Sequence, residues 1–390
     1  MLLYIRPMAD LQNNLKKFRL EAAFTQQRLA ERAGISRQAY SAVEAGDANP
    51  STEVALRLAR ALKQSFESVF VLAQELPGSV EAELVGEAGA AFHYVRTPKQ
   101  TPDRARVYRV GQRLFARPLT GPGNARHALV TAEGTIVPGV PGRTVGKSVA
   151  VQPFDREDLD TPSLVMLGCD PAVGLLEPEL HRRGIRLVAA EESSQEALLG
   201  LARGEAHVAG CHLYDDATGT FNRSWVRQLV PFPCTLVTFA SWEQGLIIAA
   251  GNPKRIQGVE SLGNPEVMIV NRQEGSGSRA FLDRALKTYD IPTGNVGGYE
   301  WEEWGHMAVA ATVAFEAADT GIAVKAAALA MGLDFITLTE ERYDLVVPDH
   351  FLNEPSVQAL LDILRQDPLR RQVESLGGYD ASRMGLPAAA

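Results

Sequence analysis

Two side chains suited to reading DNA bases stand next to each other near the N-terminus. Arg37 and Gln38 follow Ser36, a residue type that commonly caps a helix. Arginine and glutamine can make paired hydrogen bonds to guanine and adenine edges in the major groove. Side chains of the segment before them could reach phosphates. The predicted DNA contacts are Gln26, Arg28, Arg32, Ser36, Arg37, Gln38, Tyr40 and Ser41.

A second chemical feature is the turn Gly275-Ser-Gly-Ser278, which leads from an apolar run into a helical pattern. Free backbone N–H groups, hydroxyls and the positive end of a helix suit an anion. Arg272 and Arg279 could add charge. A tight turn whose serine only caps the helix explains the pattern equally well, so spacing leaves both interpretations open. No lysine follows the last glycine, which argues against a nucleotide-binding P-loop.

Candidate ligand groups also follow two other predicted strands. Asp170 and Ser193 each have a second interpretation as helix caps. His212 and His306 are scattered in the sequence, and an isolated histidine is more often structural than a ligand, so we predict no metal site. No nucleophile–base motif predicts catalytic residues. The predicted ligand-binding residues are Cys169, Asp170, Ser193, Ser194, His212, Arg272, Gly275, Ser276, Gly277, Ser278, Arg279 and His306.

Short helices must position the N-terminal side chains. Apolar residues share one face of a helix predicted over 10–23. Thr25 and Ser36 are predicted to cap helices over 26–33 and 37–44, with Gly34 in the turn between them. A fourth helix is predicted up to Leu62, and a fifth from Ser65. The residues expected to lock the second and third helices together are Leu29, Ala30, Ile35, Ala39 and Val43.

The remaining chain changes pattern twice. Residues 104–151 contain short strand-like runs separated by Gly and Pro, which indicates a small β-rich module. From residue 162, apolar strand-like runs alternate with helical segments, which is typical of α/β units. Ligands of open α/β sheets bind at the carboxyl ends of the strands, where the candidate groups stand.

Composition narrows the class of protein. The 390 residues suffice for two or three domains, and 45% hydrophobic with 22% charged residues is a soluble globular composition. The net charge of −8 argues against a wholly nucleic-acid-binding surface, but residues 8–76 hold nine Lys/Arg and eight Asp/Glu, a net of +1. The three cysteines lack disulfide or zinc spacing. With no signal peptide and no membrane-length apolar run, we predict a cytoplasmic protein without membrane contact.

The N-terminal segment, from about Leu11 to Phe70, resembles the lambda-repressor-like (Xre) helix-turn-helix family. The resemblance implies a DNA-binding domain over 8–73 that binds a double-stranded operator as a homodimer. The residues that carry it are Thr25-Gln26, Leu29-Ala30, Ala33-Gly34-Ile35-Ser36, Val43-Glu44-Ala45-Gly46 and Asn49-Pro50-Ser51.

Residues from about 163 to 379 resemble the periplasmic-binding-protein-like domains found behind regulatory helix-turn-helix domains. The resemblance implies two α/β lobes that close on a small ligand, with strands crossing near 237–249 and 338–347. It makes molybdate or tungstate a reasonable effector. The motifs that carry it are Leu167-Gly-Cys-Asp-Pro-Ala, Glu192-Ser-Ser, His207-Val-Ala-Gly-Cys-His-Leu, Asn271-Arg-Gln-Glu-Gly-Ser-Gly-Ser-Arg, His306-Met-Ala-Val-Ala, Leu333-Asp-Phe and Tyr343-Asp-Leu.

Together these features predict a multidomain regulator that senses a small anion and is not an enzyme. An all-α head (8–73) is followed by a linker and β-rich module (74–153) and a ligand domain (154–385), with lobe I at about 160–240 and 345–385 and lobe II at about 245–340. No cofactor is predicted. Alternatives are a sensor of an organic ligand or molybdenum cofactor species, an enzyme acting on such a ligand, and a constitutive scaffold whose α/β domain only dimerises.

Overall fold

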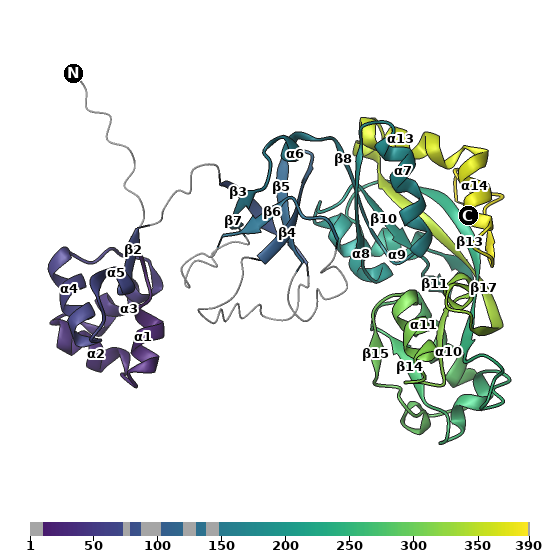
Figure 1. The fold of residues 1–390 in the computed structure, drawn as a ribbon, viewed down its shortest axis with the longest axis horizontal. Helices are drawn as coiled ribbons and strands as arrows, with labels where there is room; N and C mark the ends of the chain where they lie inside the picture. The colour runs from purple at the N-terminus through teal and green to yellow at the C-terminus, as the bar shows by residue number, and fades with distance from the viewer. Residues whose placement is uncertain (1–10, 73–78, 87–102, 120–129, 138–147, 389–390) are drawn as a thin grey trace. The chain divides into compact units, whose positions relative to one another are not determined.

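The computed structural model describes residues 11–72, 79–86, 103–119, 130–137 and 148–388. The chain divides into two compact units, Met1–Leu159 and Asp160–Ala390. Its architecture confirms the predicted fold class: a helical head, a small β-rich module and a two-lobed α/β domain (Figure 1). Among the described residues, no helix combines the length and the apolar character that crossing a membrane requires.

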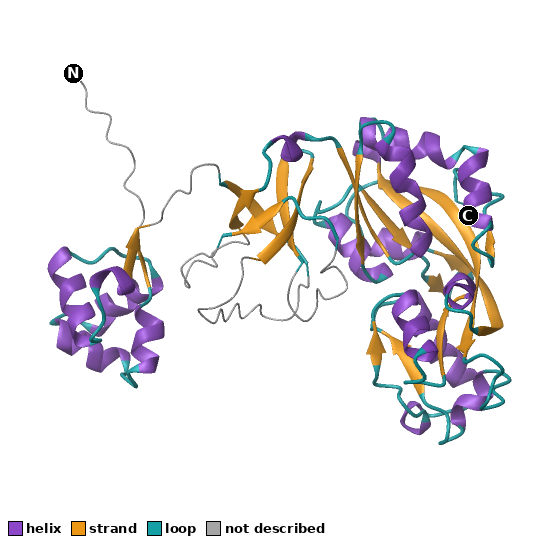
Figure 2. Cartoon of the chain, in the orientation of Figure 1, coloured by secondary structure: helices purple, strands orange, loops and turns teal. Residues whose placement is uncertain are grey.

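The N-terminal region is a bundle of short helices with a two-stranded ribbon (Figure 2). The helix predicted over 10–23 begins only at Leu15, because Leu11–Asn13 pairs antiparallel with Phe70–Leu72 instead. This ribbon holds the two ends of the region side by side. The elements are β1 (Leu11–Asn13), α1 (Leu15–Glu21), α2 (Gln26–Ala33), α3 (Arg37–Ala45), α4 (Thr52–Ala61), α5 (Phe66–Val69) and β2 (Phe70–Leu72).

Capping residues set the boundaries of α2 and α3, as the sequence predicts. The Thr25 hydroxyl accepts a hydrogen bond from the Arg28 N–H at 3.2 Å, and the Ser36 hydroxyl accepts one from the Ala39 N–H at 3.1 Å. Gly34 lies between the two helices with a φ of 74°, a backbone conformation that favours glycine. The turn that sets the angle between the two helices is therefore encoded locally.

The face of α3 that packs inward differs from the prediction. Tyr40 is fully buried, whereas Ala39, expected in the core, is exposed. The buried Glu44 carboxylate explains the difference, because it accepts hydrogen bonds from the Tyr40 hydroxyl at 2.9 Å, the Arg19 Nε at 2.7 Å and the Gln26 amide at 2.6 Å. One carboxylate thus joins α1, α2 and α3.

In the sequence, the helical region is followed by five strands that form a closed barrel. Residues 74–78 and 87–102 of the stretch predicted as a linker lie outside the described residues. Within this stretch, Val80–Leu84 is a strand that closes the barrel by pairing with Arg113–Pro118 and Ser148–Pro153. Small and branched apolar side chains, including Ala105, Val107 and Val151, fill the interior. In barrel order the strands are β3 (Val80–Leu84), β5 (Arg113–Pro118), β4 (Asp103–Val110), β6 (Gly134–Ile136) and β7 (Ser148–Pro153).

The second unit is built on one mixed sheet that runs through both lobes. The sheet order is β15, β14, β16, β13, β17, β10, β8 and β9, with β18 paired to β13. Apolar runs supply the strands, and all residues of Thr320–Val324 and Val208–Cys211 are buried. The bounds are β8 (Ser163–Gly168), β9 (Arg186–Glu191), β10 (Val208–Cys211), β13 (Cys234–Ile248), β14 (Ile269–Arg272), β15 (Glu302–Glu303), β16 (Thr320–Val324), β17 (Asp334–Pro348) and β18 (Tyr379–Asp380).

Two long antiparallel strands connect the lobes. The 15-residue strands β13 and β17 pair along most of their length, and the predicted crossings at 237–249 and 338–347 fall largely within them (Figure 1). Lobe I holds β8, β9, β10 and β18, and lobe II holds β14, β15 and β16. The register shifts between Thr238 and Ala240 and between Gln244 and Gly245. Each lobe therefore continues directly into the other through the same two strands.

Helices pack on the sheet in both lobes (Figure 2). Lobe II has its own core, which includes Leu246, Ile269, Leu282 and Ile322. The remaining elements are α6 (Glu157–Asp160), η2 (Pro171–Leu176), α7 (Glu177–His181), α8 (Ser194–Ala202), β11 (Tyr214–Asp215), β12 (Thr220–Phe221), α9 (Arg223–Leu229), η3 (Val259–Gly263), α10 (Gly277–Thr288), η4 (Thr293–Asn295), α11 (His306–Ala314), α12 (Lys325–Ala330), η5 (Asp349–Phe351), α13 (Pro355–Leu364) and α14 (Asp367–Glu374).

A buried histidine in lobe I makes stability depend on pH. The Nδ1 atom of His207 accepts a hydrogen bond from the Val165 N–H at 3.1 Å, which requires an unprotonated nitrogen. Burial lowers the pKa of His207 from 6.5 to about 4. The unfolded chain therefore binds a proton at a higher pH than the folded chain. The stabilising contribution is full above pH 6.5 and is lost as the pH falls toward 4.

Replacing His207 with Asn should remove this pH dependence while keeping a side-chain acceptor. From about 1.4 kcal/mol per pKa unit, we expect the original chain to lose about 3 kcal/mol of unfolding free energy, relative to the variant, between pH 7 and pH 4. Urea unfolding of both proteins across this range measures the difference. Parallel curves for the two proteins would contradict the assignment.

Candidate functional site

The N-terminal half of α3 presents an exposed polar surface. Arg37, Gln38 and Ser41 are all exposed, and the Ser36 cap fixes where the helix begins. None of the ion pairs in the described part of the chain involves Arg37. Its guanidinium and the Gln38 amide are therefore available to base edges, as expected for the second helix of a helix-turn-helix.

Other predicted DNA contacts have different surroundings. Tyr40 was predicted to contact DNA and therefore to face outward, which is wrong, because its ring belongs to the core and its hydroxyl donates to Glu44. The Gln26 amide donates to Glu44 as well. Arg28 and Arg32 are exposed, with guanidinium carbons 5.3 Å and 4.6 Å from the centre of the Phe24 ring. Both arginines therefore place positive charge on the exposed surface of α2. A phosphate contact by either of them remains a prediction.

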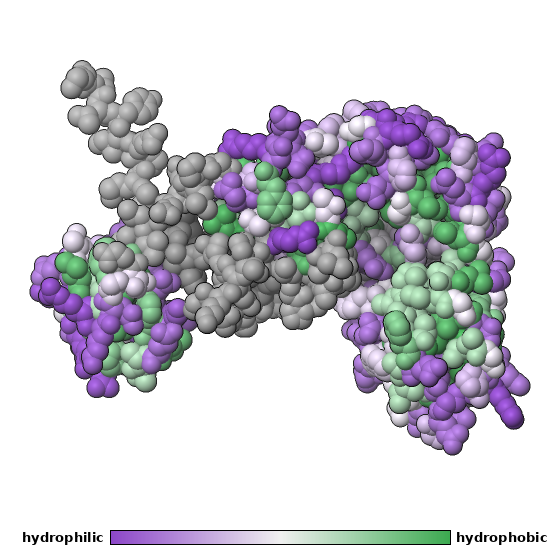
Figure 3. Space-filling model, in the orientation of Figure 1, coloured by the Kyte–Doolittle hydropathy of each residue, from purple (hydrophilic) through white to green (hydrophobic). Residues whose placement is uncertain are grey.

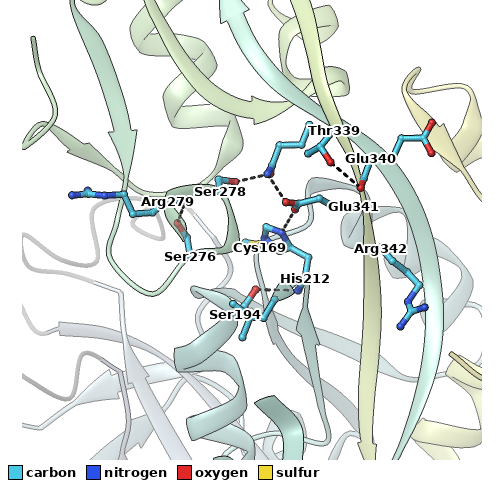
Figure 4. A network of polar contacts seen from close by, with 12 residues as sticks. Cys169, Ser194, His212, Ser276, Ser278, Arg279, Thr339, Glu340, Glu341 and Arg342 are labelled. Atoms are coloured by element: carbon cyan, nitrogen blue, oxygen red, sulfur yellow. Dashed lines mark hydrogen bonds and ion pairs between the residues drawn. The ribbon is translucent and has the colours of Figure 1, made fainter. Parts of the chain in front are cut away.

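A chain of buried hydrogen bonds links the two lobes of the second unit (Figure 4). The Ser278 hydroxyl of α10 donates to Oε1 of Gln244 at 2.8 Å, and the Gln244 amide donates to the Glu341 carboxylate at 2.7 Å. The other Glu341 oxygen lies 2.6 Å from Nδ1 of His212. The Nε2 atom of His212 lies 3.4 Å from Cys169 Sγ. This network runs from lobe II through β13 and β17 into lobe I.

Three residues that are far apart in the sequence meet at the lobe I end of this network. One potential ligand atom from each of Cys169, His212 and His306 lies within 4.8 Å of the other two, and all three residues are buried. Neither ring nitrogen of His306 has a hydrogen-bond partner in the described part of the chain. Their wide separation in the chain hid this grouping at the level of spacing.

Arg272 brings a buried positive charge to the same region. Its side chain is fully buried, and Nε donates to the Gln273 side chain at 3.0 Å. The two terminal guanidinium nitrogens have no acceptor among the described residues. Neither do the buried donors Gln273 Nε2 and Trp242 Nε1. A guanidinium stays protonated in proteins, and an unpaired buried charge is costly, so this arrangement suits an anion.

The two histidines have opposite electrostatics. Burial opposes protonation of His212, but Cys169 and the Glu341 carboxylate outweigh it and raise the pKa of His212 to about 10. Burial lowers the pKa of His306 well below 6.5, and the nearby positive charges of Arg272 and His212 lower it further. His306 is therefore a neutral imidazole.

Burial also raises the pKa of Asp170 to about 6, although the Tyr379 hydroxyl donates to its carboxylate at 2.6 Å.

Glycines allow the lobes to approach at this site. A Cβ on Gly277 would lie 2.5 Å from the His212 ring and 2.6 Å from the His212 carbonyl oxygen. Gly275 has a φ of 80°, and its carbonyl accepts a hydrogen bond from the Gln195 N–H at 3.4 Å. The Gly-Ser-Gly-Ser turn of lobe II thus lies against the start of α8 and against His212 in lobe I.

Several predicted ligand residues form helix caps. The Ser193, Ser276 and Asp170 side chains accept hydrogen bonds from backbone N–H groups two or three residues ahead. Ser194 accepts one from the His212 N–H. Arg279 extends away from the network (Figure 4). Its guanidinium pairs with Glu302 and Asp283. A ligand contact by any of these residues remains a prediction.

Sequence reasoning missed four site residues: Trp242, Gln244, Gln273 and Glu341. Trp242, Gln244 and Glu341 lie in the middle of the long crossing strands, away from the strand ends where ligand groups were sought. One signal was present, because Gln244 directly precedes the apolar run 245–250. A polar residue beside a buried run needs a partner, here Glu341 and Ser278.

Two family models match the chain. Residues 15–69 match the model described as Helix-turn-helix, and residues 177–365 match the model described as PBP superfamily domain. An uncharacterized protein of Bacillus subtilis (strain 168), YvgK, is 30% identical over 241 residues, which are 61% of this chain and 78% of that protein. The uncharacterized HTH-type transcriptional regulator YgzD of the same organism is 35% identical over 65 residues, 17% of this chain and 98% of that regulator.

Solved structures resemble the second unit more distantly. A putative phosphate ABC transporter substrate-binding protein from Clostridium perfringens has a TM-score of 0.44 at 10% identity, covering 58% of this chain and 100% of that one. The tungstate ABC transporter from Geobacter sulfurreducens has a TM-score of 0.42 at 13% identity, covering 55% of this chain and 98% of that one.

Proposed function

Since the chain belongs to the family of the Bacillus subtilis protein YvgK and joins a helix-turn-helix domain to a PBP superfamily domain, we propose that it is a transcriptional regulator controlled by a small anion. The protein acts in the cytoplasm, where the helix-turn-helix domain binds a DNA operator through Arg37 and Gln38. The anion binds between the lobes of the second unit, at Arg272.

The observation that carries this proposal is the buried guanidinium of Arg272, whose terminal nitrogens have no acceptor among the residues that the structure describes. Moving an isolated charge out of water costs several kcal/mol unless a counter-charge compensates it. The terminal guanidinium nitrogens form a planar fork that matches the oxygens of carboxylates and phosphates. Two further buried donors, on Gln273 and Trp242, have no partner within the described ranges and add hydrogen-bonding capacity for such a ligand. A compact oxyanion, with molybdate and tungstate among the candidates, meets these requirements.

The polar character of the inter-lobe region favours a sensor over a scaffold. A domain that only dimerised would gain most from apolar packing between its lobes. Here the lobes meet through His212, Glu341, Gln244 and Ser278, which are all buried. We therefore assign the region to reversible ligand binding.

Dimer formation is part of the proposal. A domain with a net charge of +1 gains little from phosphates alone, so one copy holds an operator weakly. Lobe II exposes large apolar side chains, with Phe315 at 82% and Leu329 at 49% exposure, and Figure 3 shows apolar surface on this lobe. Exposed apolar patches often mark protein contacts. Ligand binding would act on DNA affinity only through its preference for one of two conformations.

The proposal is tested by titrating the full-length protein with molybdate, tungstate, sulfate and phosphate. At about 100 times its dissociation constant, a ligand adds about 2.7 kcal/mol, so we expect at least one anion to raise Tm by roughly 5 °C or more. Chloride at matched ionic strength is the control. Stabilisation by a neutral organic compound, with no response to any oxyanion, would contradict the anionic assignment.

A further inference from the structure

The cysteine and two histidines of the inter-lobe site have the composition of a metal centre. Thiolate and imidazole are the ligands that Zn²⁺ and neighbouring transition metals prefer. Cys169, His212 and His306 supply these groups from three different segments, at the end of β8, after β10 and at the start of α11. All are buried, so the ligand atoms are shielded from competing bulk water.

The measured separation fits coordination by a single ion. Zn–S and Zn–N bonds of about 2.3 Å and 2.0–2.1 Å, at a tetrahedral angle, place the two ligand atoms about 3.5 Å apart. Cys169 Sγ and His212 Nε2 are 3.4 Å apart, and the His306 ligand atom lies within 4.8 Å of both. Both buried ring nitrogens of His306 lack a hydrogen-bond partner in the part of the chain that the structure describes, and coordination would satisfy one of them.

The Glu341 carboxylate holds the His212 ring in position, as carboxylates that accept a hydrogen bond from a metal-bound histidine do in known metal sites. Metal-bound histidines almost always donate their second ring N–H to a carboxylate, a backbone carbonyl or water. Here Nδ1 of His212 lies 2.6 Å from Glu341, which leaves Nε2 directed at Cys169. The same Glu341 accepts from Gln244, so its own position is held.

We propose that Cys169, His212 and His306 bind one divalent transition-metal ion, with Zn²⁺ as the representative metal. Three protein ligands leave a fourth coordination position open, as in zinc sites that take up an exogenous ligand. The ion joins lobe I, through Cys169 and His212, to lobe II, through His306. Metal binding therefore stabilises the contact between the lobes. The three ligands do not include Arg272, on which the anion proposal rests, although its guanidinium charge acts on His306.

Cobalt provides the test, because four-coordinate Co²⁺ with a thiolate ligand gives visible d–d bands and a near-ultraviolet charge-transfer band. The full-length protein, first treated with a chelator and a reductant, is titrated with Co²⁺ alone. We expect one equivalent to bind with both bands and Zn²⁺ to displace it. The Cys169→Ser variant should lose the thiolate band, and the Cys234→Ser control, whose sulfur lies outside the cluster, should keep it.

Two further variants keep the test decisive. His306→Gln removes a side chain that makes no hydrogen bond to any described residue, so the variant should fold and should bind Co²⁺ far more weakly. Glu341→Gln should weaken Co²⁺ binding by about 10–100-fold through the orientation of His212. Absence of stoichiometric binding, a thiolate band that survives in Cys169→Ser, or a His306→Gln variant that binds Co²⁺ as tightly as the original chain would overturn the proposal. The titration contains no oxyanion and no DNA, so its failure would leave the anion proposal standing.

Discussion

Replacing Arg272 with methionine is expected to abolish the response to oxyanions and to make the ligand-free protein more stable. A guanidinium that loses its ligand contacts forfeits about 2–5 kcal/mol, so the dissociation constant should rise by at least about 30-fold. Without ligand, the buried charge of Arg272 has no partner among the described residues, and methionine fills similar volume without charge. We expect the unfolding free energy to rise by about 1–4 kcal/mol.

Urea unfolding with and without the most stabilising oxyanion measures both the unfolding free energy and the stabilisation that the anion adds. Arg227→Met is the matched control, because Arg227 is an exposed arginine of α9 in the same unit. It should leave anion binding and stability nearly unchanged. An Arg272→Met protein that keeps the anion response would show that the anion binds elsewhere. One that loses stability without ligand would show that the guanidinium has a compensating partner.

The double substitution Arg37→Ala with Gln38→Ala is expected to eliminate specific DNA binding. Each paired contact to a base edge is worth about 1–3 kcal/mol, so losing two should weaken binding by roughly 30-fold or more. Both side chains are exposed in the first turn of α3, and neither belongs to the core of the helical region. The variant should therefore fold normally. A duplex selected from a random library by the full-length protein serves as the probe in a mobility-shift assay.

The control carries the same two residue types on another helix. Arg60 and Gln64 are exposed at and just beyond the end of α4, and their double substitution to Ala changes the charge equally. It should reduce affinity uniformly across sequences through weaker electrostatics, without changing the selected site. If both double variants lose binding equally, then α3 does not read the bases.

The helical region was predictable because its boundaries are set by adjacent residues. Thr25, Gly34 and Ser36 each act within a few positions of themselves, through a capping hydroxyl or a left-handed turn. The errors arose where distant residues decide. Leu11–Asn13 became a strand because Phe70–Leu72 lies beside it. Tyr40 turned inward because Glu44 and Arg19 form a partly buried pair there.

The inter-lobe site was predictable only in part for the same reason. Placing ligand groups at strand ends led to Cys169, His212 and Arg272, because strand ends can be read from local pattern. The burial of Arg272, and the meeting of His306 with His212, depend on how two lobes pack. Gln244 and Glu341 form one buried hydrogen bond although 97 positions separate them. Periodicity within a single segment contains no information about such a pair.

The course of β13 and β17 through both lobes has a consequence for how the second unit comes apart. A cut between the lobes would sever two 15-residue strands, and each fragment would keep only half of the central ladder. Neither lobe is therefore an autonomous folding module. Residues 160–390 should melt in one cooperative transition, so heat, a protease or a destabilising substitution that disrupts one lobe also dismantles the other.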